Sequence, residues 1–151
     1  VVGELQDLAQ ASGVFPLAEL TRIGIALSEA LSNAMIHGNL EISSEIRARD
    51  DGVYEETIRT RLAEAAFRDR RIQLLGRFTA DEIRFEIEDE GRGFDVSQVP
   101  DPKAPENYLK PSGRGLLLIR SFMDEVLHNA TGNRITLVKR VGTATDLADA
   151  P

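Results

Sequence analysis

Residues 17–37 constrain the fold most, because their apolar side chains fall on most sides of a helix. The apolar positions are Ile23, Ile25, Ala26, Leu27, Ala30, Leu31, Ala34 and Met35. A helix that is apolar nearly all round is buried rather than laid on a surface. We therefore predict a central helix over residues 17–37. Gly38 follows directly, and we expect it to end the helix with a backbone of positive φ.

A polar stripe interrupts this apolar helix. Glu29, Asn33 and His37 are spaced four apart in the sequence and therefore share one helix face. An amide oxygen such as that of Asn33 can ligate Mg²⁺, and a carboxylate one turn earlier can accept a proton from an attacking hydroxyl or water. Each residue taken singly is explained as well by a solvent-facing edge, and His37 by a helix-end histidine that bonds local carbonyls. Only the combination indicates a site.

The remaining segments predict an α+β fold. Residues 1–10 favour a short first helix, and the charged segment 41–71 a peripheral helical excursion. Alternation of apolar and polar residues over 72–87, broken at 79–82, predicts a hairpin, and residues 126–140 predict two further strands. Together these segments predict a two-layer α/β sandwich with a mixed, mostly antiparallel sheet covered by helices on one face.

A second motif, Asp89-x-Gly91-x-Gly93, ends the second predicted strand. The carboxylate can accept a hydrogen bond from the exocyclic amine of adenine, and the glycines let the backbone approach a nucleotide closely. By itself this pattern is also an ordinary turn. We interpret Glu90 and Arg92 as solvated turn residues.

A third motif follows a loop that is long for a compact domain, over residues 95–112. The loop closes with Ser112-Gly113-Arg114-Gly115, before a helix that starts near Leu116. Amide N–H groups and the helix dipole favour a phosphate there, and Arg114 or Lys110 could add positive charge. The alternative is a glycine hinge without a ligand. The Walker loop and Gly-x-Gly-x-x-Gly are both absent from the sequence.

Composition narrows the class of protein. A chain of 151 residues with 42% hydrophobic residues can form one compact domain, 1–151, and its net charge of -7 argues against direct nucleic-acid binding. The absence of cysteine excludes disulfides and fits a reducing cytoplasm. No apolar run approaches the length of a membrane span. The start lacks Met and a basic leader, so we expect a domain excised from a longer protein, with residues 141–151 as a tail.

Three segments of the chain, read in order, resemble the asparagine box and the two glycine boxes of GHKL-superfamily ATPases. These segments are EALSNAMIHGN, DEGRGFD and SGRGLLLIRSFMDEV, and together they span residues 29–126. The likeness is greatest to the anti-sigma factor serine-protein kinases. The resemblance implies a Bergerat-type fold that binds ATP or ADP with Mg²⁺, with residues 95–112 as the ATP lid. It implies that Glu29 activates the substrate hydroxyl, Asn33 holds the metal and Asp89 reads adenine. The implied phosphate-bracketing glycines are Gly91, Gly93, Gly113 and Gly115.

The resemblance also implies partners. These are an anti-anti-sigma protein of the STAS type that carries the acceptor serine, a sigma factor as the alternative partner, an upstream sensor or receiver domain, and a second copy of the chain in a homodimer. Two features depart from the family. Pro111 stands where an arginine often precedes the lid serine, with Lys110 before it, and the segment 41–71 is longer than in the compact kinases.

These departures keep two other functions open. One is the catalytic domain of a histidine kinase, whose phosphoacceptor would lie outside this chain, since only His37 and His128 are available here. The other is a nucleotide-gated binding module that switches partners through its lid without chemistry.

Overall fold

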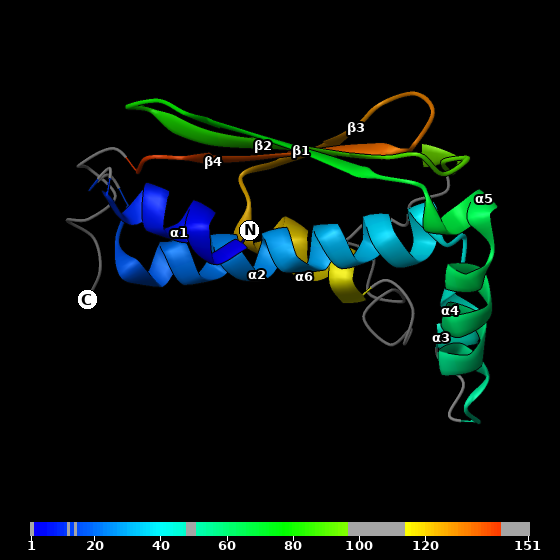
Figure 1. The fold of residues 1–151 in the computed structure, drawn as a ribbon. Helices are drawn as coiled ribbons and strands as arrows, with labels where there is room; N and C mark the ends of the chain where they lie inside the picture. Colours follow the sequence, from blue (N-terminus) through cyan, green and yellow to red (C-terminus); the bar gives the residue numbers. More distant parts are fainter. Residues whose placement is uncertain (1, 12, 14, 48–50, 97–113, 143–151) are drawn as a thin grey trace.

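The computed structural model describes residues 2–11, 13, 15–47, 51–96 and 114–142, and these form a helical layer against one face of a sheet (Figure 1). The predicted α+β two-layer fold is confirmed. The elements in chain order are α1 (Val2–Ala11), α2 (Leu17–Asn33), the π-helix η1 (Ala34–Asn39), α3 (Ser44–Arg47), α4 (Val53–Ala63), α5 (Ala65–Arg68), β1 (Ile72–Phe78), β2 (Glu82–Asp89), α6 (Arg114–Phe122), β3 (Glu125–His128) and β4 (Arg134–Arg140).

The sheet has the strand order β1-β2-β4-β3, and each neighbouring pair is antiparallel. No parallel pair occurs among the described strands, so the mixed component that we expected is absent from them. The predicted hairpin is present: the N–H of Thr79 donates to the carbonyl of Glu82 at 3.0 Å. On β2 the alternation buries Ile83, Phe85 and Ile87, which pack in one cluster with residues of the helices.

The core lies between the sheet and α2, so the predicted central helix is confirmed. Its expected burial on nearly all sides is wrong, because Ile25 is 40% exposed and Met35 in η1 is 48% exposed, on the side away from the core. Leu27 of α2, Phe85 of β2, Ile119 of α6 and Leu137 of β4 are all at most 1% exposed and belong to one apolar cluster. α1 and α6 lie beside α2 in the same layer (Figure 1). Burial of α2 by these neighbours fixes which of its faces is left to form a site.

The end of the central helix differs from the prediction. α2 continues into η1, and Gly38 lies inside that π-helical turn rather than after it. The described glycines with positive φ are Gly13, Gly52, Gly93 and Gly132, so the expected positive φ at Gly38 is wrong. Single π-turns within helices are frequent at functional sites. A different constraint, described below, requires glycine at this position.

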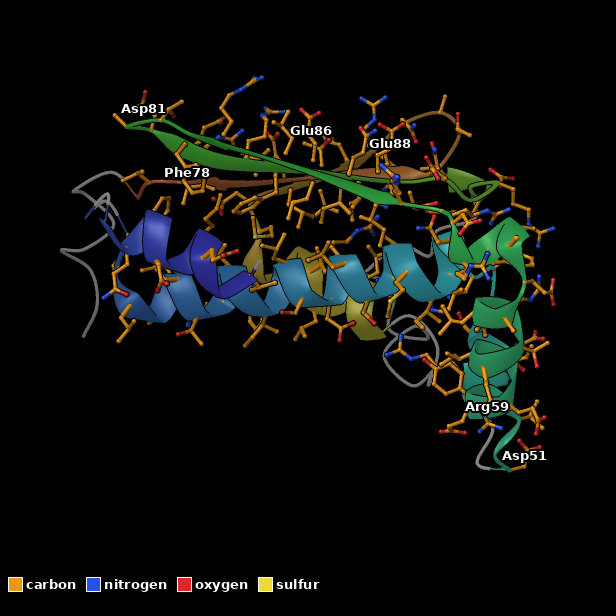
Figure 2. The ribbon with its side chains drawn as sticks, viewed as in Figure 1. Asp51, Arg59, Phe78, Asp81, Glu86 and Glu88 are labelled. Carbon is orange, nitrogen blue, oxygen red and sulfur yellow. The ribbon has the colours of Figure 1, made fainter. Side chains whose placement is uncertain are left out.

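The excursion over residues 41–71 is helical, as predicted. α3, α4 and α5 project from the end of the helical layer at which η1 lies (Figures 1 and 2). They are attached by a second apolar cluster, in which Ile36, Leu40 and Ile42 are buried. The partly buried members are Ile46, Tyr54, Ile58 and Phe67. The guanidinium groups of Arg61 and Arg70 lie 4.1 and 4.8 Å from the Phe67 ring centre, which adds cation–π attraction to the attachment.

Candidate functional site

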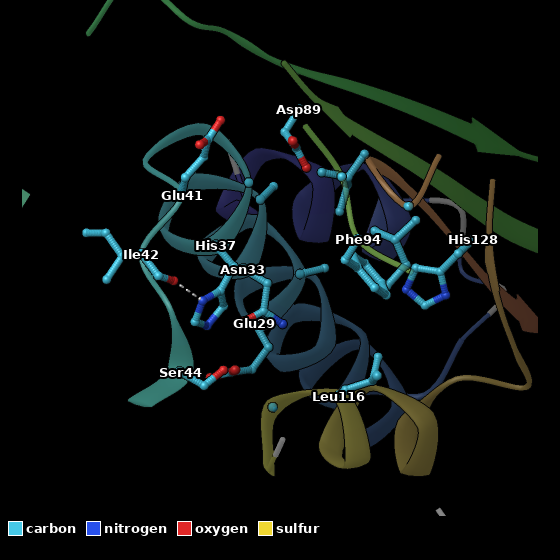
Figure 3. Close-up of a pocket in the computed structure, with 18 of the residues that line it drawn as sticks. Glu29, Asn33, His37, Glu41, Ile42, Ser44, Asp89, Phe94, Leu116 and His128 are labelled. Carbon is cyan, nitrogen blue, oxygen red and sulfur yellow. Dashed lines mark hydrogen bonds between the residues drawn. The ribbon is translucent and has the colours of Figure 1, made fainter. Parts of the chain in front are cut away.

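A cleft of about 810 Å³ lies where α2 and η1 meet the end of β2 and the start of α6 (Figure 3). Its volume is in the range of small-molecule sites. The residues that line it are Glu29, Ala30, Asn33, Ala34, His37, Gly38, Glu41, Ile42, Ser43, Ser44, Arg47, Ile87, Asp89, Arg92, Gly93, Phe94, Gly115, Leu116, His128, Gly132 and Ile135. The structure thus brings one part of each of the three sequence motifs to a single cleft.

The polar stripe of the central helix faces this cleft. Glu29, Asn33 and His37 all line it, and Gly115 in the first turn of α6 lies opposite. A Cβ atom at Gly115 would lie 2.3 Å from Oε2 of Glu29 and 3.6 Å from Nδ2 of Asn33. The distance to Asn33 is an ordinary contact, but a side chain at position 115 would push the flexible end of Glu29 aside. The stripe is therefore the wall of a site rather than an open helix edge.

Asp89 ends β2 at another part of the cleft, and its position is strongly held. Its Oδ1 accepts a hydrogen bond of 2.9 Å from the N–H of Gly91. Its backbone N–H donates to the carbonyl of Asn133 at 3.0 Å, and Nδ2 of Asn133 donates to the Asp89 carbonyl at 2.9 Å. Burial raises the pKa of Asp89, while the Gly91 hydrogen bond and the charge of Arg70 oppose that rise.

Glycines pack the chain against Asp89. A Cβ atom at Gly38 would lie 2.3 Å from Cγ of Asp89, and one at Gly91 would lie 2.3 Å from the carbonyl oxygen of Gly38. Gly93 has a φ of +73°, and its Cβ would lie 2.0 Å from the carbonyl oxygen of Thr131. The sequence pattern indicates that Gly91 and Gly93 let the backbone approach a ligand, but contacts within the protein already require glycine at both positions. Gly93 also lines the cleft, whereas Gly91 does not.

Asn39 connects the elements around Asp89, a role that the sequence did not reveal. The residue is buried, with 5% of its surface exposed. Nδ2 donates to the carbonyl of Arg71 at 3.1 Å, and Oδ1 accepts the N–H of Glu90 at 2.8 Å. The carboxylate of Glu90 in turn accepts the N–H of Arg71 at 2.9 Å. Glu90 is therefore more than the solvated turn residue that we expected, because it joins the end of β2 to the start of β1.

Glu41 is a second cleft residue that sequence reasoning missed. It has a φ of 49°, which is uncommon for a residue other than glycine and is often found at functional sites. Arg70 Nη1 lies 2.8 Å from Oε1 of Glu41, and this hydrogen bond is the main cause that lowers the pKa of Glu41. Arg92 is 80% exposed, as a solvated turn residue should be, but it also lines the cleft, 3.8 Å from Glu41 Oε2.

The two histidines both line the cleft. Nδ1 of His37 lies 2.6 Å from the carbonyl oxygen of Ile42. Because a carbonyl only accepts, Nδ1 carries the hydrogen, which confirms the predicted bond to a local carbonyl. His128 ends β3, and its ring meets that of Phe94 edge-on at 5.4 Å between centres. Burial, together with the charge of Arg120, lowers the pKa of His128.

Several predicted residues lie outside the described ranges. These are Lys110, Ser112 and Gly113, together with most of the predicted lid 95–112 and of the predicted tail 141–151. Arg114 is the first residue of α6. Their roles stay predictions.

A comparison with family models matches residues 1–139 to the histidine kinase-like ATPase domain. The chain belongs to this ATPase family. Its α+β fold is the GHKL type expected from the three boxes, and domains of this family bind ATP, typically with Mg²⁺. No curated protein matches the sequence. Among the described residues of this histidine kinase-like ATPase domain, no helix is both long and apolar enough to cross a membrane.

The cleft of this ATPase domain suits a nucleotide with a metal ion. Glu29 and Gly38, which contacts Asp89, are nine residues apart, so roughly two helical turns separate the two ends of the cleft. Ile87, Leu116 and Ile135 supply apolar wall. Asp89 offers an acceptor at one end, and the oxygens of Glu29 and Asn33 at the other are of the kind that Mg²⁺ prefers.

Proposed function

We propose that this ATPase domain is an ATP- and Mg²⁺-dependent protein-serine kinase that acts in the cytoplasm as an anti-sigma-type, partner-switching regulator. One observation carries the proposal. Glu29 and Asn33 share a helix face at one end of the cleft, and Asp89 lies at the other. One bound nucleotide could therefore place its purine against the hydrogen-bond acceptor Asp89 and its phosphates beside Glu29, the proposed base.

Asp89 would hold the adenine. Its carboxylate accepts a hydrogen from the exocyclic amine, while Gly91 and Asn133 keep the residue in place. The half-buried position makes this bond stronger than one made in open water.

Asn33 and Glu29 would serve the phosphoryl transfer. The amide oxygen of Asn33 would ligate Mg²⁺, which neutralises charge on the phosphates when bound. Glu29 would take the proton of the substrate serine as the serine oxygen bonds to the γ-phosphorus and the bond from that phosphorus to ADP breaks. Contact with Gly115 limits where the Glu29 carboxylate can lie. The predicted phosphate ligands Lys110, Ser112, Gly113 and Arg114 belong to the same proposal.

The phosphate acceptor would be a serine of an anti-anti-sigma partner of the STAS type. A sigma factor would be the alternative binding partner, and this chain would itself form a homodimer. The test is incubation with Mg-ATP and the cognate STAS-type partner, followed by mass spectrometry of that partner. We expect phosphoserine with the wild type and none with Glu29→Ala, which should still bind ADP. Absence of phosphoserine with the wild type would end the kinase proposal.

The family match also favours a second candidate, the catalytic domain of a histidine kinase. His37 is bonded to Ile42 and His128 packs against Phe94, both in the cleft wall. A phosphoaccepting histidine would therefore have to lie outside this chain. Phosphohistidine on a longer form of the protein, or on another protein incubated with this domain, would support that candidate over the serine kinase.

The departure at Pro111 motivates a third candidate, the nucleotide-gated binding module without chemistry. Pro111 lies outside the described residues. ATP turnover that disappears in Glu29→Ala would exclude this candidate, because a module that only binds has no need of a base.

A further inference from the structure

The short helix α3 contributes to the cleft although it belongs to the excursion. Ser44 and Arg47 both line the cleft. They are three residues apart and so lie on the same side of a helical turn. Ile46 between them packs instead against the second apolar cluster, around Ile36, Leu40 and Ile42. α3 thus has one side that anchors it and another that faces the cleft.

The cleft-facing side of α3 lies at the Glu29 end. Figure 3 shows the polar ends of Ser44 and Glu29 directed toward one another, away from the part of the cleft that Asp89 occupies. Arg47 follows Ser44 by about one turn and is exposed. Because Arg47 also lines the cleft, the helical spacing places its side chain on the same side of α3 as Ser44.

The lining of the cleft carries more negative than positive side chains, so a bound polyphosphate would need a cationic partner there. Glu29, Glu41 and Asp89 contribute three carboxylates to the lining. Of the described arginines and lysines, Arg47 and Arg92 line the cleft, and Arg92 lies beside Glu41, 3.8 Å from its carboxylate. A polyphosphate needs positive charge, and a guanidinium group offers two parallel N–H donors to phosphate oxygens.

We infer that Arg47 binds the terminal phosphates of the nucleotide. The excursion over residues 41–71 is then a part of the nucleotide site and not merely a peripheral addition to the fold. This inference rests on the proposed binding of ATP in the cleft, and it adds a ligand that none of the three sequence motifs contains.

The test compares ATP, ADP and AMP, each with Mg²⁺, by calorimetry on the wild type and on Arg47→Gln. The variant should bind ATP and ADP roughly ten- to a hundredfold more weakly, because a charge-assisted hydrogen bond is lost. AMP, which lacks the terminal phosphates, should bind as it does to the wild type. Arg47→Lys should recover part of the ATP affinity, because lysine keeps the charge but not the two parallel donors.

Arg59→Gln is the matched control. Arg59 is exposed on α4 of the same excursion (Figure 2) and is not among the residues that line the cleft. The variant has the same net charge as Arg47→Gln. It should bind all three nucleotides like the wild type.

Unchanged ATP affinity in Arg47→Gln would overturn the inference, and so would an equal loss for AMP, which would indicate a general disturbance of the cleft. The proposed function fails separately, if the wild type binds none of the three nucleotides. If Asp89→Asn weakens all three while Arg47→Gln weakens none, the proposed site stands and the role of Arg47 is refuted.

Discussion

Gly38→Ala is expected to displace the Asp89 carboxylate and thereby weaken nucleotide binding. The added Cβ would lie 2.3 Å from Cγ of Asp89 and 2.5 and 2.6 Å from its two oxygens, whereas real contacts of a Cβ essentially never fall below 3.0 Å. The backbone of Asp89 is tied to Asn133 by two hydrogen bonds, and the carbonyl of Gly38 is already in close contact with Gly91. The side chain of Asp89 is therefore the part that must move.

The effect on stability should be smaller than the effect on binding. Overpacking typically costs about 1–3 kcal/mol, and alanine gains about 1 kcal/mol over glycine in a helical turn. The free energy of unfolding should therefore fall by about 0–2 kcal/mol. Loss of the hydrogen bond that the Asp89 carboxylate accepts from the adenine amine should weaken ADP binding by on the order of 1.5–3 kcal/mol, or roughly ten- to a hundredfold.

The assay is calorimetry with ADP and Mg²⁺, together with urea unfolding. Gly3→Ala is the control, because Gly3 lies in α1 with nothing within 4 Å of its added Cβ. It should stabilise the fold slightly and leave ADP affinity unchanged. Asp89→Asn should weaken ADP binding by about 1–3 kcal/mol, and adding Gly38→Ala to it should cost little further affinity, because both changes act on one carboxylate. Wild-type affinity in Gly38→Ala, or fully additive losses, would refute the reasoning.

Three further outcomes are expected. Gly115→Ala should shift the flexible end of Glu29, whose Oε2 would lie 2.3 Å from the new Cβ. We expect phosphoserine to form at least tenfold more slowly, with the affinity for ADP little changed. Equal rates of phosphoserine formation would count against the role of Glu29. Asn39→Ala should lower the free energy of unfolding by about 2–3 kcal/mol in urea, because the Arg71 carbonyl and the Glu90 N–H lose their partner; a loss below about 0.5 kcal/mol would show that water replaces the amide. Since burial raises the pKa of Asp89, its carboxylate protonates at a higher pH than that of an ordinary aspartate. ADP binding needs the ionised carboxylate, so the affinity for ADP should fall as the pH falls through the raised pKa. Asp89→Asn should lack this pH dependence.

Much of the fold could be predicted because its signals are local. The helical spacing of apolar residues over 17–37 and the alternation around Ile83, Phe85 and Ile87 repeat within a few residues, and both are confirmed. The same local spacing places Glu29, Asn33 and His37 on one face. The strand that precedes Asp89 likewise follows from alternation alone.

The rest of the site depends on contacts between distant residues. Asn39 bonds to Arg71 and Glu90, which are 32 and 51 positions away, and Glu41 bonds to Arg70 across 29 positions. No periodic pattern encodes such pairs, because they exist only after the strand register and the packing of η1 have been set. The sequence by itself thus determined the helices, the strands and the polar stripe. The tertiary structure alone decided that Gly38 must lack a side chain, since the atom that excludes one belongs to Asp89 on another element.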